Sequence, residues 1–154
     1  DDIYAVGDAG VILHNNGTRW TSVQSPTGNT LYRISASSAD DMYAVGSYGT
    51  VIQYKGTEWV TVNSGTSQHL QSVFSIADNE VYAAGWEGIV LQYNGTQWAV
   101  MENCVQENLE GLWGLPGEKI YSVGGGGTVL LKKNTSGSVH SAVISAVMLL
   151  LLSE

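Results

Sequence analysis

One pattern recurs along the sequence at a constant spacing of 39 residues, and it limits the possible folds more than any other feature. A tyrosine occupies the same place in each copy, at Tyr4, Tyr43, Tyr82 and Tyr121. Two glycines follow each tyrosine, three and six residues later: Gly7 and Gly10, Gly46 and Gly49, Gly85 and Gly88, and Gly124 and Gly127. A fixed period of about 20 to 50 residues is typical of repeat architectures, in which each unit buries its apolar face against the next.

The remainder of each copy keeps the same register. A short apolar run leads to a glycine turn, and a tryptophan stands three residues after that glycine. These tryptophans are Trp20, Trp59 and Trp98. Asn16-Gly17 has the composition of a two-residue type I′ hairpin turn, which needs positive φ at both residues, and we predict Trp20 to be a buried anchor of the strand that follows. The fourth copy departs from the pattern, with Asn134 at the glycine position and Gly137 at the tryptophan position.

The composition favours strands over helices. The chain has 19 glycines, eight tyrosines and five tryptophans but only two prolines, and 44% of its 154 residues are hydrophobic. Such a chain supplies short strands, tight turns and a sizeable core. Four-stranded sheets repeated at about 40 residues are the blades of a β-propeller. We predict an all-β fold: a β-propeller of four blades, each with four antiparallel strands, in a single domain over residues 1–154 with repeats starting near residues 2, 31, 70 and 109.

The two ends of the sequence raise the question of how the ring closes. The first copy reads as three strands, and Met148–Leu152 lies three periods after Leu31–Ser35, the first strand of a complete copy. We therefore expect an apolar C-terminal strand over residues 139–152 to complete the N-terminal blade, or the blades to belong to a larger ring, including one built by two chains. The competing interpretation is a truncated membrane anchor, because Ala142–Leu152 is about half of the roughly 20 apolar residues that span a bilayer. As it stands, this segment does not span.

The repeat resembles a known group of propellers. The segments Asp41–Gly46, Gly49–Ile52 and Gly56–Trp59 are similar to bacterial propeller repeats related to Asp-box (bacterial neuraminidase) repeats and to photosystem-assembly-factor propellers, and the resemblance covers about residues 1–137. It implies a propeller from a bacterial secreted or cell-surface protein. An Asp box carries an aspartate two residues before the turn glycine, where this chain has Asn15, Tyr54 and Tyr93. Sialidase-type activity is therefore not expected.

Charge and residue spacing argue against several kinds of function. The net charge is −8, so the chain lacks the basic face that nucleic acid or an acidic membrane surface requires. The three histidines share neither a repeat phase nor a ligand spacing, so we expect no metal site and no cofactor. Gly124–Gly127 precedes a strand rather than a helix and is not a phosphate loop. Cys104, the one cysteine, allows no internal disulfide.

The copies differ most in the residues between the two framing glycines. In a four-stranded meander these tips lie on the same face as the connections between blades, which here are residues 25–30, 64–69 and 103–108. Loops on a rigid scaffold are where binding is usually found. The ligand-binding candidates on this face are Asp8, Tyr48, His69, Trp86, Glu87 and Glu107. Tyr48 and Trp86 could stack on a sugar ring beside Glu87 and Asp8, or they could simply cover the top of the core.

These observations favour a non-enzymatic propeller, secreted or at the cell surface, that acts as an interaction or assembly scaffold for a protein partner or for self-association. One alternative is a carbohydrate-binding, lectin-like propeller. A second is a fragment of a glycoside hydrolase or lyase in which Glu107 and Glu110 act as acid and base. We predict no catalytic residues.

Overall fold

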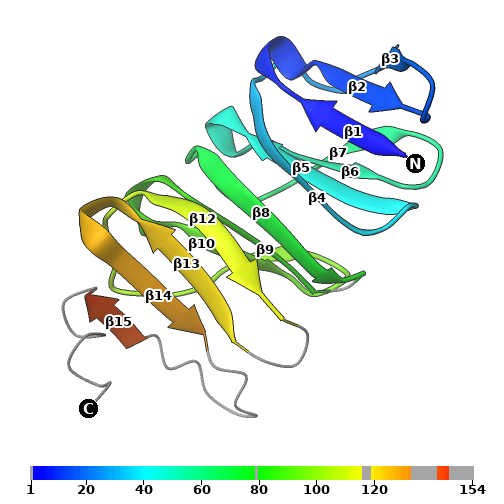
Figure 1. Ribbon diagram of the computed structural model, residues 1–154. Helices are drawn as coiled ribbons and strands as arrows, with labels where there is room; N and C mark the ends of the chain where they lie inside the picture. Colours follow the sequence, from blue (N-terminus) through cyan, green and yellow to red (C-terminus); the bar gives the residue numbers. More distant parts are fainter. Residues whose placement is uncertain (1, 79, 116–118, 133–141, 146–154) are drawn as a thin grey trace.

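The computed structural model describes residues 2–78, 80–115, 119–132 and 142–145. Four antiparallel sheets stand side by side in an arc, which confirms the all-β propeller architecture (Figure 1). Blade 1 has three strands, β1 (Ile3–Val6), β2 (Ile12–Asn15) and β3 (Trp20–Val23). Blade 2 has β4 (Leu31–Ser38), β5 (Asp41–Gly46), β6 (Val51–Tyr54) and β7 (Trp59–Val62). Blade 3 has β8 (Leu70–Ala77), β9 (Glu80–Gly85), β10 (Val90–Tyr93) and β11 (Trp98–Val100). Blade 4 has β12 (Leu109–Gly114), β13 (Ile120–Gly124), β14 (Thr128–Lys132) and β15 (Ala142–Ser145).

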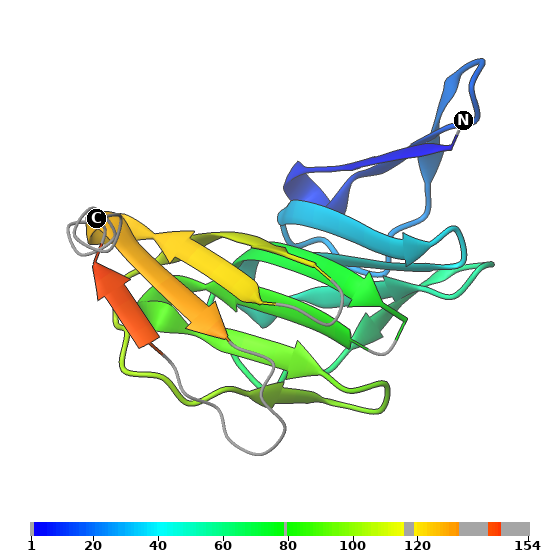
Figure 2. The same cartoon turned by 60° about the horizontal axis from the view of Figure 1, so that its bottom comes forward.

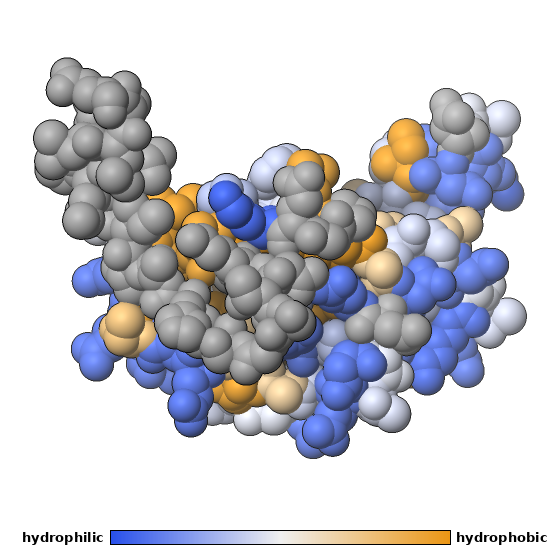
Figure 3. Space-filling model, turned by 90° about the horizontal axis from the view of Figure 1, so that it is seen from below, coloured by the Kyte–Doolittle hydropathy of each residue, from blue (hydrophilic) through white to orange (hydrophobic). Residues whose placement is uncertain are grey.

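Each sheet is a simple meander, in which every strand pairs with the next one along the chain. The first strands of blades 2 to 4, β4, β8 and β12, pack beside one another and form the inner side of the arc (Figure 2). Viewed from below, hydrophobic residues show on the upper, inner side, and hydrophilic residues cover much of the lower rim (Figure 3). The outer strands β7 and β11 lie on the convex side of the arc.

The core lies between the blades, because one such sheet cannot bury both of its faces alone. Between blades 1 and 2, Tyr4 packs at 6.3 Å from Trp59, and between blades 2 and 3, Tyr43 packs at 6.0 Å from Trp98, measured between ring centroids. Trp59 and Trp98 are buried, as the repeat predicts. The prediction of a buried Trp20 is wrong, since this side chain is 49% exposed. The described residues place no sheet against the face of blade 1 that carries it.

The hairpin turns differ from the predicted type I′ geometry. Gly17 has φ +89°, but Asn16 is not among the described residues with positive φ. The connection spans four residues, and the Asn16 side-chain oxygen accepts hydrogen bonds from the Thr18 and Arg19 amides at 3.1 and 3.2 Å. Asn94 does the same for Thr96 and Gln97 in blade 3. The asparagine thus shapes the turn through its side chain, which removes the need for a left-handed backbone at that position.

The last strand of blade 4 begins later than the period predicts. In blade 2, Ile52 pairs with Thr61. In blade 4 the residue two periods after Ile52 is Leu130, and it pairs with Val143 rather than with position 139. The connection between β14 and β15 is therefore four residues longer than its counterpart in blade 2.

The predicted C-terminal strand over residues 139–152 is described only at Ala142–Ser145, and the closing segment Met148–Leu152 lies outside the described residues. Ala142–Ser145 pairs with β14 of its own blade, and within the described part of the chain β1 pairs with β2 alone. Blades 1 and 4 stand at opposite ends of the arc, so the described residues do not form a closed ring.

Candidate functional site

The turn between the two framing glycines has the same unusual backbone in all four blades. It forms one 3₁₀ turn per blade: η1 (Asp8–Gly10), η2 (Ser47–Gly49), η3 (Trp86–Gly88) and η4 (Gly125–Gly127). The central residue of each turn is left-handed, with φ between +54° and +64°, and it is Ala9, Tyr48, Glu87 or Gly126. A left-handed non-glycine residue costs roughly 1–2 kcal/mol. Blade 4 avoids that cost with glycine, whereas blades 2 and 3 hold large side chains there.

The second framing glycine has no substitute, because the next connection passes directly over it. A Cβ atom on Gly49 would lie 2.0 Å from the Thr66 carbonyl oxygen, and Gly49 itself has φ +68°. Gly10 and Gly88 meet the carbonyl oxygens of Thr27 and Val105 in the same way, so the tips of blades 1 to 3 are each clamped between a glycine and the connection that leads to the next blade. This clamp holds Tyr48 and Glu87 in place on a rigid support.

Four aromatic side chains meet at the junction of blades 2 and 3, and we call them the aromatic cluster: Tyr32, Tyr48, His69 and Trp86. The His69 ring stacks on Trp86 with centroids 4.2 Å apart and lies 5.0 Å from Tyr48. The Tyr32 ring lies nearly parallel to that of His69, with centroids 6.3 Å apart, and its hydroxyl lies 3.2 Å from His69 Nδ1. The amide of Trp86 donates to the His69 carbonyl at 2.9 Å, which fixes the two rings to each other through the backbone.

The aromatic cluster faces solvent. Tyr48 is 69% exposed, Trp86 40% and Tyr32 37%, while His69 at the centre is half-buried. Exposed rings that are locked by stacking and by backbone hydrogen bonds lose little conformational entropy when a ligand packs on them. Aromatic side chains are also the ones that most often carry binding energy at interfaces.

A polar group borders the aromatic cluster. The Gln68 amide donates to the Glu87 carboxylate at 2.5 Å, and the Glu87 backbone amide donates to the Asn108 side-chain oxygen at 3.1 Å. Glu87 follows Trp86 directly, so a negative charge stands next to the rings. Together they offer π faces and a carboxylate, which suit a ligand with apolar or cationic groups.

The structure brings four of the six predicted candidates together and leaves two apart. Tyr48, His69, Trp86 and Glu87 meet at one junction, as described above. Asp8 lies in η1 of blade 1, and Glu107 lies against Gly125 and Gly126 at the next junction. No described hydrogen bond, ion pair or ring contact joins either carboxylate to the aromatic cluster.

Sequence reasoning missed Tyr32. It follows the leucine that opens blade 2, at a position where blade 3 has Gln71 and blade 4 has Glu110. Tyr32 is an aromatic residue at a position where the other copies have none, and this departure from the repeat could have indicated a functional role. Its contact with His69 depends on the neighbouring inner strands β4 and β8, which a reading of single copies does not reveal.

Burial and acidic neighbours keep two core tyrosines neutral. Burial, together with Asp41 and Tyr93, raises the pKa of Tyr43 well above its usual value, and burial and Glu80 do the same to the pKa of Tyr82. The Tyr43 hydroxyl also lies 2.7 Å from the Gln53 amide, and the Tyr82 hydroxyl donates to Glu80 at 2.9 Å. These hydroxyls belong to the framework.

No three or more His, Cys, Asp and Glu side chains among the described residues are placed to hold a metal ion. No helix in that part of the chain is long and apolar enough to cross a membrane.

Comparison with known proteins shows the fold. No family model and no curated protein matches the chain. Among solved structures, it is similar to YCF48 bound to D1 peptide (TM-score 0.69, 11% identity, 96% of this chain and 52% of that one). It is also similar to YCF48 from Cyanidioschyzon merolae (TM-score 0.67, 12% identity, 92% and 52%) and to the WD40 repeats of RRP9 (TM-score 0.73, 12% identity, 93% and 49%). The chain thus spans about half the length of these propellers. The predicted likeness to photosystem-assembly-factor propellers is confirmed as a likeness of fold, and kinship with Asp-box repeats stays a prediction.

Proposed function

We propose that this chain is a non-enzymatic interaction module of a bacterial secreted or cell-surface protein, and that its aromatic cluster binds a segment of a protein partner. The observation that carries the proposal is the convergence of Tyr48, His69 and Trp86, from two blades and the connection between them, into one exposed and rigidly supported surface.

The backbone of the two tips supports the same conclusion. Tyr48 and Glu87 occupy left-handed positions that favour glycine, and the fourth blade has glycine there. Ala9 of blade 1 has the same conformation, so the turn itself imposes it, but blades 2 and 3 keep a large side chain at this strained position and present it at the loop tip. These are also the two tips nearest to the aromatic cluster.

The chemistry of the surface indicates the kind of partner. The aromatic faces favour apolar or cationic side chains, and the Glu87 carboxylate beside them adds attraction for lysine or arginine. The partner is therefore expected to present an extended segment or loop with a basic residue next to an apolar one. The structure of YCF48 bound to D1 peptide provides a precedent for a peptide on a propeller of similar fold.

The experiment is a selection of peptides from a displayed random library on the full chain, followed by measurement of the dissociation constants of the selected peptides. Trp86→Ala is expected to weaken binding by at least about 30-fold, as truncation of a central aromatic anchor does. Trp113→Ala is the matched control, because Trp113 is 55% exposed on β12 and lies outside the aromatic cluster. Equal losses in the two variants, or none in Trp86→Ala, would contradict the proposal.

A glycan is the second candidate ligand. Exposed rings beside a carboxylate and an amide, here Trp86 with Glu87 and Gln68, are the groups that stack on a sugar and bind its hydroxyls. A glycan array would decide in its favour if one class of sugar binds and the binding is lost in Trp86→Ala but not in Trp113→Ala. An array without such binding removes this candidate and leaves the protein partner.

A further inference from the structure

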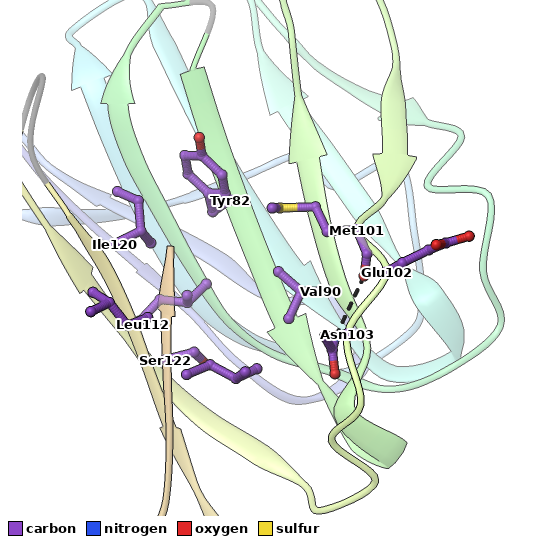
Figure 4. Close-up of a pocket in the computed structure, with 10 residues that line it drawn as sticks. Tyr82, Val90, Met101, Glu102, Asn103, Leu112, Ile120 and Ser122 are labelled. Atoms are coloured by element: carbon purple, nitrogen blue, oxygen red, sulfur yellow. Dashed lines mark hydrogen bonds between the residues drawn. The ribbon is translucent and has the colours of Figure 1, made fainter. Parts of the chain in front are cut away.

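A cavity lies between blades 3 and 4, on the opposite side of blade 3 from the core that holds Trp98. It measures about 40 Å³, and its walls are almost entirely apolar. The side chains that form it are Tyr82, Val90, Met101, Leu112, Ile120 and Leu130 (Figure 4). The exposed residue Glu102 borders it, and its carboxylate points away from the cavity, so the cavity reaches the surface beside Met101 and Glu102.

At the other two junctions between blades, aromatic side chains fill the space that corresponds to this cavity. One period before Tyr82, Leu112 and Leu130 stand Tyr43, Val73 and Leu91, and all three belong to the core cluster between blades 2 and 3 that contains Trp98. The cavity is therefore the counterpart of a region that an indole and a phenol ring fill. At the junction of blades 1 and 2 the same place is filled by Tyr54 and Trp59.

Blade 4 lacks the two aromatic side chains that fill the equivalent space at the other junctions. After Tyr121 the sequence contains no tryptophan, tyrosine or phenylalanine. At the positions of Tyr93 and Trp98 the repeat phase places Lys132 and Gly137. The apolar walls remain, since Leu130 and Leu131 are buried and Ile120 is only 6% exposed.

We propose that this cavity is a binding site for small uncharged aromatic molecules of one or two fused rings, the size of the side chains that fill its counterparts. The described residues direct no charged group into the cavity, and the Tyr82 hydroxyl donates to Glu80, so a polar or ionised ligand would lose its hydration without compensation. A ring is larger than the cavity and enters from the side of Met101, whose unbranched thioether can move aside.

Backbone and side-chain hydrogen bonds fix the segment Met101–Asn103 at the entrance of the cavity. The Met101 amide donates to the Val90 carbonyl at 2.8 Å, and the Asn103 side chain donates to the Gly88 carbonyl at 3.0 Å. Entry of a ring therefore needs movement of the Met101 side chain and not of the backbone. This site is independent of the aromatic cluster, which lies at the other junction of blade 3.

The probe for the test is indole, titrated into the full chain and followed by calorimetry. We expect one saturable site. Leu130→Phe puts a ring into the cavity and should weaken indole binding at least tenfold. Leu91→Phe, the same change one period earlier, places its ring in a filled core and should leave indole affinity within twofold.

Trp98→Gly supplies a second measurement that does not depend on the folding of Leu130→Phe. This variant should open a similar cavity beside Tyr43, bind two indoles instead of one, and gain more thermal stability from added indole than the natural chain does. Lack of saturable binding by the natural chain, or binding that Leu130→Phe leaves unchanged, would overturn the proposal.

Discussion

The two junctions of blade 3 share one backbone plan and differ in the side chains that occupy it. At each junction the residue after the first framing glycine donates its amide to the preceding connection, Trp86 to His69 at 2.9 Å and Gly125 to Asn108 at 2.8 Å. The junction of blades 2 and 3 has a buried Trp98 in its core and the exposed aromatic cluster at its loop tips. The junction of blades 3 and 4 has a cavity in its core and only Gly125–Gly126 at its loop tip. The repeat therefore fixes the backbone, and function is expected where side chains depart from it.

The largest difference should appear when the aromatic core is removed. Trp98→Ala is expected to lower the free energy of unfolding by about 3–5 kcal/mol, because it empties a filled core. Leu130→Ala, at the cavity between blades 3 and 4, should cost about 2 kcal/mol, the low end for leucine, because its neighbours are already loosely packed. Urea unfolding monitored by circular dichroism measures both values. A larger loss in Leu130→Ala would reverse the comparison.

Overpacking should separate the junctions in the same direction. Leu91→Phe forces a ring into a filled core and is expected to cost about 1–3 kcal/mol. Leu130→Phe places the same ring in the cavity, so the free energy of unfolding should change by less than about 1 kcal/mol. The two melting curves, recorded side by side, test this. Equal destabilisation would mean that the space between blades 3 and 4 is as well filled as its counterpart.

Alkaline pH should act on the tyrosines of both junctions. The pKa values of Tyr43 and Tyr82 are raised in the folded state, so the stability they contribute is complete below pH 10 and is lost as the pH rises above it. Each should lower the free energy of unfolding by up to about 1.4 kcal/mol per pH unit in that range. Tyr43→Phe and Tyr82→Phe should each flatten the decline, as urea midpoints at pH 9 to 11 would show. A decline that neither variant alters would contradict the assignment.

The smallest effect concerns the tips. Gly126→Ala introduces a left-handed alanine and is expected to destabilise the fold by about 1 kcal/mol, while Ala9→Gly should stabilise it by a similar amount. No backbone atom crowds Gly126, so conformational strain alone is tested. Thermal denaturation of the two variants gives the signs. If both changes are neutral, the strain argument for Tyr48 and Glu87 fails.

Much of the framework could be predicted from the sequence because it depends on local and periodic features. The spacing of Tyr43 and Tyr82 and of the framing glycines sets the strands, the tight tips and the buried tryptophans. The sequence alone could not locate the register of β15, because four extra residues in the preceding connection move a strand without changing its composition. The exposure of Trp20 was missed for another reason: it depends on which sheets lie beside blade 1.

The candidate site was predictable only in part. The residues at the loop tips differ between the copies of the repeat, so Tyr48, Trp86 and Glu87 could be identified as candidates from the sequence. Tyr32 was missed because its contact with His69 crosses from one blade to the next. The cavity beside Tyr82 could not be predicted from the sequence either. The absence of a tryptophan does not show whether neighbouring side chains fill the space that it would occupy.

The most direct test of the account is amide hydrogen exchange of the full chain with and without a peptide selected on it. We expect slower exchange on binding in residues 47–49, 68–70 and 86–88, around the aromatic cluster, and unchanged exchange in residues 125–127, the matching tip of blade 4. Protection at residues 125–127 instead, or protection that leaves residues 47–49 and 86–88 untouched, would contradict the claim that the junction of blades 2 and 3 is the binding surface.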